Sequence, residues 1–371
     1  MPWGYTAPAS NSLAEGAVVV DCGARTVKAG TAREAPASHE PCLEVPAAVR
    51  LAGGGGPAHP LAGGAVRDWD RLEAIWHYVF YDQLGWVQGE EGAVMVAESP
   101  FSSRASREQL TQILFEKFNV AGLFMAETGP LALYAMGKTS GLAVDFGYTG
   151  VGISPVVEGQ TYRSGTARLA NAGGKAQAAK LLELLAGQPG CEGLGEADAE
   201  AILRACGEYA SPGAPREEAA EAASVELPDG RVVAVGSERW RCRDHVFRPP
   251  SEGSSAAEPA LAEAVVSGIL AVDDRNVRST VAENIVLCGG GSTCPSLEPV
   301  FQKEVQRRAP MPLSNVSVLQ KPNYMPDNTN HYAAWTGAAI LAKTVFNQNQ
   351  HVSKFDYDES GPTVVFKKCG L

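Results

Sequence analysis

The sequence predicts an α/β protein built from two related halves. Two apolar strands each end in Asp-x-Gly, at Asp21-Cys22-Gly23 and at Asp145-Phe146-Gly147, and a third apolar run leads into Gly289-Gly290-Gly291. Strands that alternate with helices are typical of the α/β class, and a motif that recurs suggests a duplication. Asp and Gly are also common turn residues, so the repeated motif alone is compatible with two unrelated turns.

The predicted strands are short and apolar, and they come in pairs. They lie at 17–20, 26–29, 141–144, 151–153 and 284–288. The first two follow each other so closely that they indicate a hairpin, and the next two repeat that arrangement. The last strand leads through a glycine turn into a segment of helical spacing. That geometry lets a backbone approach a nucleotide closely and offers it free helix N–H groups.

Helices and linkers follow from periodicity and composition. Helical spacing of apolar residues predicts helices at 69–84, 106–118, 297–307 and 332–346. Three segments rich in small or polar residues indicate surface loops or linkers, at 51–64, 211–223 and 251–259. Residues 1–16 are polar and contain proline, and they predict a flexible N-terminal tail.

The composition excludes several classes of function. The 371 residues are 45% hydrophobic and 20% charged, which is enough chain for two domains of ordinary size. A net charge of -11 argues against binding nucleic acid through overall charge, so no direct nucleic-acid partner is expected. The eight cysteines lack Cys-x-x-Cys pairs and zinc spacing, which is typical of a reducing intracellular compartment. No long apolar run or leader predicts a membrane span or signal peptide.

Several segments of the chain resemble the actin family. The similar segments are 59–81, 97–100 with 106–119, 226–230 with 238–242 (ELPDG and ERWRC), and the ending 357–369. The resemblance covers nearly the whole chain. It implies an actin-like (ribonuclease H-like) two-lobed ATPase fold, built from two duplicated α/β domains with a central nucleotide cleft. Within the family, 321–326 and 339–352 are most similar to the plant-type nuclear class of actin-related protein seven.

The resemblance also implies domain boundaries and a loss of polymerisation. The first lobe would comprise 17–135 and 333–371, and the second would comprise 136–332 with a small subdomain at 172–256. Residues 41–65 would form a reduced small subdomain that lacks the filament-contact loop, and the hydrophobic-plug segment 249–259 also differs. A filament needs a contact that repeats without closing, so a chain lacking both elements is not expected to polymerise.

In the actin family two hairpins hold the phosphates of ATP with a divalent cation between them. The residues that match these nucleotide contacts are Asp21, Gly23, Lys28, Asp145, Gly147, Gly289 and Gly290. Asp21 and Asp145 would hold Mg²⁺ through water, and Lys28 would offer a positive charge to phosphate oxygens. The expected cofactor is therefore ATP or ADP with Mg²⁺.

Substitutions in both turns argue against tight phosphate binding, and they leave nucleotide occupancy open. Ala24-Arg25 replaces the family's Ser-Gly in the first turn. Phe146, Tyr148 and Thr149 replace small and acidic neighbours in the second turn. Both changes remove groups that would contact phosphate or allow the backbone to approach it.

The two water-positioning residues of the family are also replaced. Thr128 stands in place of the glutamine and Gly152 in place of the histidine, so no catalytic residue is expected and hydrolysis should be very slow or absent. On the adenosine side, Thr293-Cys294 replaces Met-Tyr. His331 replaces a lysine, and it is expected to be an ordinary surface histidine.

What remains of the family's binding surfaces is a groove at the base of the molecule. The matching residues are Tyr134, Ala135, Gly137, Thr139, Gly159, Gln160, Leu341, Thr344 and Phe346. In nuclear actin-related proteins such a groove receives a long amphipathic helix of a remodeller ATPase subunit. Several of these residues would be buried in any case, so only the groove as a whole carries the hypothesis.

The favoured function is a structural subunit of a nuclear ATP-dependent chromatin-remodelling complex, with actin or another actin-related protein as a neighbour. The nuclear location rests on the resemblance, because no run of basic residues indicates a localisation signal. One alternative is a cytoskeletal ATPase that polymerises. A second is a small-molecule kinase of the shared superfold, which the actin-type ending disfavours.

Overall fold

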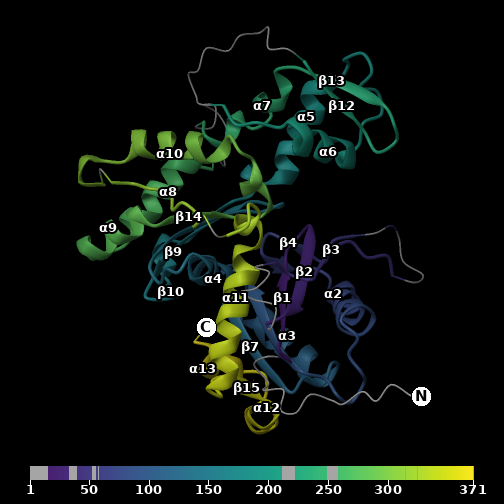
Figure 1. The fold of residues 1–371 in the computed structure, drawn as a ribbon, viewed down its shortest axis with the longest axis vertical. Coiled ribbons are helices and arrows are strands. Elements are labelled where there is room, and N and C mark those ends of the chain that lie inside the picture. The colour runs from purple at the N-terminus through teal and green to yellow at the C-terminus, as the bar shows by residue number, and fades with distance from the viewer. Residues whose placement is uncertain are drawn as a thin grey trace. The chain divides into compact units, whose positions relative to one another are not determined.

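Two α/β units make up the chain, as the predicted fold class requires (Figure 1). The units are Met1–Ala135 with Ala334–Leu371, and Met136–Ala333. The computed structural model describes residues 16–32, 40–51, 56, 58–210, 222–248, 258–313, 315–323 and 325–370. Apart from Gly16, the predicted N-terminal tail lies outside the described residues, as do most of the linkers predicted at 211–223 and 251–259.

The first unit is built on a sheet with the strand order β15-β7-β6-β1-β2-β3. The bounds are β1 (Val18–Cys22), β2 (Thr26–Thr31), β3 (Leu43–Pro46), β6 (Ala93–Glu98), β7 (Gly122–Glu127) and β15 (Val352–Ser353). The antiparallel pair β1 and β2 confirms the first predicted hairpin, and its register places Asp21 opposite Lys28. Strand β6 runs parallel to β1 on its other side.

Strand β1 is apolar throughout because both faces of the sheet are covered. Val18 and Val20 belong to the core that contains Trp76 of one face. Val19 belongs to a second core, in which the Trp335 Nε1–H donates to its carbonyl at 3.2 Å. A strand that is buried on both faces has a continuous run of apolar residues, and this run is why β1 could be predicted from the sequence.

Helices of the first unit surround this sheet. They are α2 (Trp69–His77), the π-helix η1 (Tyr78–Gln83), α3 (Arg104–Glu116), α4 (Thr128–Ala135), α12 (Lys354–Ser360) and α13 (Val364–Cys369), with the small ribbon β4 (Leu61–Ala62) and β5 (Ala65–Val66). Helix α11 (Thr329–Asn347) begins in the second unit and continues in the first. The helix predicted at 69–84 therefore changes from α to π geometry after His77, where Phe80 stacks on Trp86 at 4.6 Å.

The second unit repeats the strand arrangement of the first. Its sheet has the order β10-β9-β8-β14, and β11 pairs with β9. The bounds are β8 (Gly141–Phe146), β9 (Val151–Val157), β10 (Gln160–Thr161), β11 (Ala167–Leu169) and β14 (Ile285–Cys288). Strands β8 and β9 form an antiparallel hairpin, and β14 runs parallel to β8. The predicted hairpin and third strand are thus confirmed.

Two cores stabilise the second unit. One packs the main sheet against α8 (Leu261–Leu270), α9 (Arg275–Glu283) and α10 (Leu297–Arg308), with Phe301 fully buried. The other packs α5 (Gly174–Leu185) and α6 (Glu196–Cys206) against the ribbon β12 (Ala223–Glu226) and β13 (Val232–Val235). Short helices α7 (Glu238–Arg241) and η5 (Gly290–Thr293) complete this unit together with other single turns.

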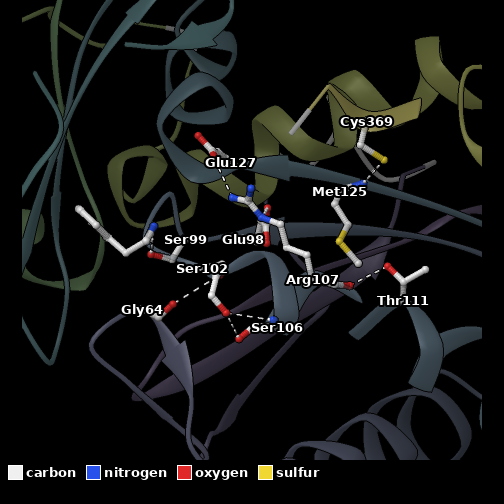
Figure 2. Close-up of polar contacts among 12 residues, drawn as sticks. Gly64, Glu98, Ser99, Ser102, Ser106, Arg107, Thr111, Met125, Glu127 and Cys369 are labelled. Carbon is white, nitrogen blue, oxygen red and sulfur yellow. Dashed lines mark hydrogen bonds and ion pairs between the residues drawn. The ribbon is translucent and has the colours of Figure 1, made fainter. Parts of the chain in front are cut away.

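A buried ionic cluster joins the ends of β6 and β7 in the first unit (Figure 2). Glu98 and Glu127 are register partners on these two strands. Arg107 of α3 lies against both carboxylates, with Nε 2.6 Å from Glu98 and Nη2 2.8 Å from Glu127. Each of the three side chains is only about one-twentieth exposed. Because buried charges are costly unless they are paired, the guanidinium is required to hold both carboxylates.

We predict unequal effects when this cluster is cut in two ways. Arg107→Met should lower the free energy of unfolding by about 3–5 kcal/mol, because two buried carboxylates lose their cation. Glu127→Gln should cost much less, because it leaves one carboxylate paired with one guanidinium. Urea unfolding followed by circular dichroism measures both, and equal losses would contradict the assigned role of Arg107.

His351 gives the first unit a dependence on pH. Its side chain is buried, with the ring centroid 5.0 Å from that of Phe346. Burial lowers the pKa of His351 below its usual 6.5; Lys368 adds to the shift and Asp356 opposes it. As the pH falls through about 6.5, the unfolded chain takes up a proton that the folded chain still refuses. The contribution of His351 to stability is therefore complete above that pH and is lost below it.

We expect His351→Gln to remove part of the fall in melting temperature between about pH 7.5 and about pH 5.5. Differential scanning calorimetry at several pH values would measure it. His77→Gln, at an exposed histidine of α2, is the matched control and should leave the slope unchanged. The same slope in His351→Gln and in the unaltered protein would rule out this assignment.

Candidate functional site

The first hairpin brings three of the predicted nucleotide residues together. Lys28 Nζ lies 3.5 Å from Asp21 Oδ2, and both side chains are largely buried. The Gly23 N–H donates to the Thr26 carbonyl at 3.0 Å, and a Cβ on Gly23 would lie 2.9 Å from that oxygen. Lys28 thus already has an anionic neighbour within its own hairpin. Its charge is offset by Asp21, which weakens its attraction for a phosphate.

Arg25 is accommodated in the turn of this hairpin. Its carbonyl accepts the N–H of Ala47 at 2.9 Å, so the turn is tied to the residue that follows β3. The small residue expected for close approach to a phosphate is replaced by a long cationic side chain on a fixed backbone.

The turn of the second hairpin is fastened to helices of its own unit. The Gly147 N–H is used within the turn, at 3.1 Å from the Asp145 carbonyl and 3.0 Å from that of Gly150. The N–H groups of Gly174 and Lys175 at the start of α5 donate to the carbonyls of Gly147 and Tyr148. These bonds make the turn part of the packing between β8 and α5.

Tyr148 and Gly173 provide further contacts between the second turn and its own unit. The Tyr148 hydroxyl donates to a Glu196 carboxylate oxygen on α6. Burial, reinforced by Glu196 and Glu200, raises the pKa of this hydroxyl well above its usual range, so Tyr148 stays a neutral donor. Gly173 packs so tightly that a Cβ there would lie 2.2 Å from the Gly150 nitrogen. The side chain that replaced a small or acidic residue now binds α6.

The glycine loop after β14 lies against the end of β8. Gly289 has a φ of 86°, and a Cβ there would lie 2.2 Å from Asp145 Oδ1. Its N–H donates to the Asn330 carbonyl at 3.1 Å. A Cβ on Gly291 would lie 3.0 Å from that of Phe146. The structure therefore brings Asp145, Gly147 and Gly289 together within the second unit.

His331 also belongs to this group. A Cβ on Gly290 would lie 3.7 Å from its ring, and the ring packs edge-on against Tyr332 with centroids 4.5 Å apart. His331 lies in the first turn of α11 and is partly buried.

Thr128 and Gly152 are the residues predicted to stand at the two water-positioning sites. Thr128 is the first residue of α4, and the carboxylate of the preceding Glu127 is paired with Arg107. Gly152 faces Asp145 in the β8–β9 register and has no side chain to offer. General base catalysis needs a polar group within hydrogen-bond reach of water, and Glu127 is held away from that task by its ion pair.

The predicted groove residues differ widely in exposure. In the first unit Ala135 and Phe346 are buried in the core, Tyr134 and Leu341 are partly buried, and Thr344 is exposed. In the second unit Gly137, Thr139 and Gln160 are exposed, and the Gly159 N–H donates to the Thr139 carbonyl at 2.7 Å. Only the exposed or partly exposed members can touch a partner directly.

Three features of the site were not visible in the sequence. They are the Arg107 cluster, the Tyr148 bond to α6 and a contact between Arg243 and Cys294. A glutamate that ends two successive apolar strands is a signal that could have pointed to the first. The other two join residues 48 and 51 positions apart, and no local pattern marks them.

The described part of the chain contains no helix long and apolar enough to cross a membrane. Among the same residues, no group of three or more His, Cys, Asp or Glu side chains is arranged to hold a metal ion. Taken separately, each hairpin fits a nucleotide only in part. The first keeps the charges of Asp21 and Lys28 and the second keeps that of Asp145, while the hydrogen bonds of each turn lie within its own unit.

We predict that Gly289 and Gly290 tolerate a methyl group very differently. Gly289→Ala should lower the free energy of unfolding by about 1–3 kcal/mol, because of its positive φ and the clash with Asp145. Gly290→Ala should change it by about 0.5 kcal/mol or less, since its Cβ would meet only an ordinary contact. Chemical denaturation compares the two, and similar costs would show that Asp145 does not occupy this space.

Comparison with known proteins identifies the family of the chain. The Actin family model matches residues 56–190 and 201–370. The chain is 35% identical over 369 residues to actin-related protein 7 of Arabidopsis thaliana, covering 95% of this chain and 99% of that protein. It is 35% identical to actin-related protein 7 of rice over 366 residues, with the same coverage. It is also 31% identical to actin-like protein 9 of Bos taurus, covering 95% of this chain and 88% of that protein. The predicted resemblance, including the similarity to actin-related protein seven of plants, is confirmed, and the chain belongs to the actin family.

Proposed function

We propose that the chain is a non-polymerising actin-related protein that serves as a structural subunit of a nuclear ATP-dependent chromatin-remodelling complex. The observation that carries the proposal is the hairpin architecture retained in both units. The family resemblance places Thr128 and Gly152 where the water-positioning residues are expected, and a fold kept without those groups would serve binding rather than hydrolysis.

Nucleotide would have a structural role in such a protein. Bound ATP or ADP with Mg²⁺ would supply negative charge to Lys28 and a divalent cation to Asp21 and Asp145, with Gly23, Gly147, Gly289 and Gly290 leaving room for the backbone approach. The Asp21–Lys28 pair and the Tyr148 bond already satisfy each hairpin without a ligand. In the proposed role nucleotide is therefore a structural ligand, and turnover is not part of that role.

The short segment between β2 and α2 supports the absence of polymerisation. Within the described residues it forms only β3 and the ribbon of β4 and β5, where the Arg67 N–H donates to the Pro60 carbonyl at 2.7 Å. A contact loop that reaches a neighbouring subunit needs more chain than this ribbon offers. Most of the predicted hydrophobic-plug segment, 249–257, lies outside the described residues.

The proposed partner is a long amphipathic helix of a remodeller ATPase subunit. In such a mode the apolar face of the partner helix lies in a groove, and its anchors recur at helical spacing. The exposed predicted members, Thr344 in the first unit and Gly137, Thr139 and Gln160 in the second, are the ones available for contact. Actin or another actin-related protein would be a neighbour in the same complex.

We expect the full-length protein to recover a remodeller ATPase subunit from nuclear extract, identified by mass spectrometry. Thr344→Arg and Gln160→Arg should each reduce recovery roughly tenfold or more, since a central contact at an interface is lost. Ser279→Arg, on the exposed face of α9, is the matched control and should recover the subunit as before. Recovery that is equal for all variants would place the partner elsewhere.

The polymerising alternative is tested on the same preparation. The protein with Mg-ATP and salt is centrifuged, and released phosphate is measured. A pellet that forms together with phosphate release would overturn the proposal in favour of a cytoskeletal ATPase.

A further inference from the structure

Arg243 is a buried cation of the second unit that has no carboxylate partner among the described residues. Its side chain is more than nine-tenths buried, and its Nε has no hydrogen-bond partner. Nη2 donates to the Leu203 carbonyl at 3.4 Å, and the guanidinium lies 4.8 Å above the ring of Tyr209. A buried guanidinium with only neutral neighbours is costly, so the group that balances its charge is of interest.

The neighbouring carboxylates are engaged with other cations. Glu208 pairs with Arg239 at 4.0 Å, and Asp244 pairs with Arg248 at 3.3 Å. Neither carboxylate forms an ion pair with Arg243.

The nearby weak acids are held neutral. Burial raises the pKa of Tyr209, with Arg243 opposing the shift. Burial also raises the pKa of the Cys206 thiol and raises that of Cys242 to about 12. None of these three side chains therefore supplies negative charge at neutral pH.

Cys294 is the side chain that Arg243 contacts most directly. Arg243 Nη1 donates to Cys294 Sγ at 3.0 Å. Ser296 Oγ lies 3.3 Å from the same sulfur, and this oxygen accepts the Tyr209 N–H at 2.7 Å, which leaves the hydroxyl proton free to point at sulfur. The carbonyl of Gly207, at 3.4 Å, is the acceptor for the thiol proton when it is present.

The exposure of Cys294 and its position before α10 also favour reaction at its sulfur. Cys294 is partly exposed, so a small molecule can reach it. It lies three residues before α10, a helix of 12 residues whose N-terminal N–H groups favour negative charge. A cation, a hydroxyl and a helix N-terminus are the surroundings in which cysteines react as nucleophiles.

We propose that Cys294 is a site of oxidation by hydroperoxides. The sulfur gives up its proton and attacks one oxygen of hydrogen peroxide; an S–O bond forms, the O–O bond breaks, and hydroxide leaves. The hydroxide combines with the released proton to give water, so a thiol and hydrogen peroxide become a sulfenic acid and water. The sulfur loses two electrons, and the peroxide accepts them. Arg243 and Ser296 stabilise the negative charge as it passes from the attacking sulfur to the leaving oxygen.

The oxidation site does not depend on the proposed function. It is formed within the second unit by Cys294 and Ser296, which lie between η5 and α10, and by Arg243, which follows α7, and it needs neither nucleotide nor a partner helix. Cys294 lies at the end of the glycine loop, four residues after Gly290, so its oxidation changes a side chain of that loop.

The test uses the full-length reduced protein and hydrogen peroxide at neutral pH. Sulfenic acid is trapped with dimedone, and labelling of each cysteine is followed over time by peptide mass spectrometry. Cys42, which is exposed, serves as the reference thiol in the same sample. We expect Cys294 to be labelled roughly tenfold faster than Cys42 or more, because donors aimed at developing charge have effects of at least this size.

Variants then assign the effect to Arg243. Arg243→Met should slow labelling of Cys294 roughly tenfold and leave Cys42 unchanged, whereas Arg243→Lys should retain part of the rate because it keeps the charge. Arg241→Met, at an exposed arginine two residues away, is the matched control and should have no effect. Ser296→Ala should cause a smaller loss of rate.

Two results would overturn the proposal. One is labelling of Cys294 in the unaltered protein that is no faster than that of Cys42. The other is an unchanged rate in Arg243→Met when its circular dichroism spectrum is native. If Arg243→Met fails to fold, Arg243→Lys and Ser296→Ala decide, and full rates in both would reject the assigned roles.

Discussion

The close approach of Asp145 to Gly289 is the constraint on which the second unit depends. The carboxylate at the end of β8 fills the space that a side chain at position 289 would need, so β8, β14 and the loop after β14 are placed by one contact. In the first unit the strands are arranged in the same way, but the residue that faces the carboxylate differs. There Asp21 faces Lys28 across the hairpin, whereas Asp145 faces Gly152. The carboxylate at the end of the first strand thus faces a lysine in one unit and a glycine in the other.

This difference affects the interactions that each hairpin can make with a ligand. In the first hairpin the Lys28 ammonium compensates the charge of the Asp21 carboxylate. In the second hairpin the carbonyls of the turn accept the N–H groups at the start of α5. Tyr148 extends that hold to α6 through Glu196. Tyr148, which the family resemblance places where a small or acidic residue is usual, thus attaches the turn to its own unit.

The sequence predicted elements whose signal is local and missed those whose cause is distant. Val18–Val20 and their counterparts in β8 are buried on both faces, so a continuous apolar run marked them. The π-helix after α2 was not predicted, because the helical spacing of apolar residues does not distinguish α from π geometry. The site residues Asp145 and Gly289 could be named from glycine turns and from the resemblance to actin. Their contact was not predicted, because it joins strands that are far apart in the chain.

Two buried arginines show why contacts of a charged side chain with distant residues cannot be predicted from sequence patterns. Arg107 lies between two carboxylates, so its cluster is complete, and Glu127 is fixed in an ion pair instead of serving as a base beside Thr128. Arg243 has no carboxylate partner among the described residues, and it donates a hydrogen bond to the partly exposed Cys294 thiol. Both guanidinium groups are buried, so the difference lies in the counter-charge that each one meets. Because these partners lie far from each arginine in the sequence, only the folded chain shows which of the two has its charge compensated.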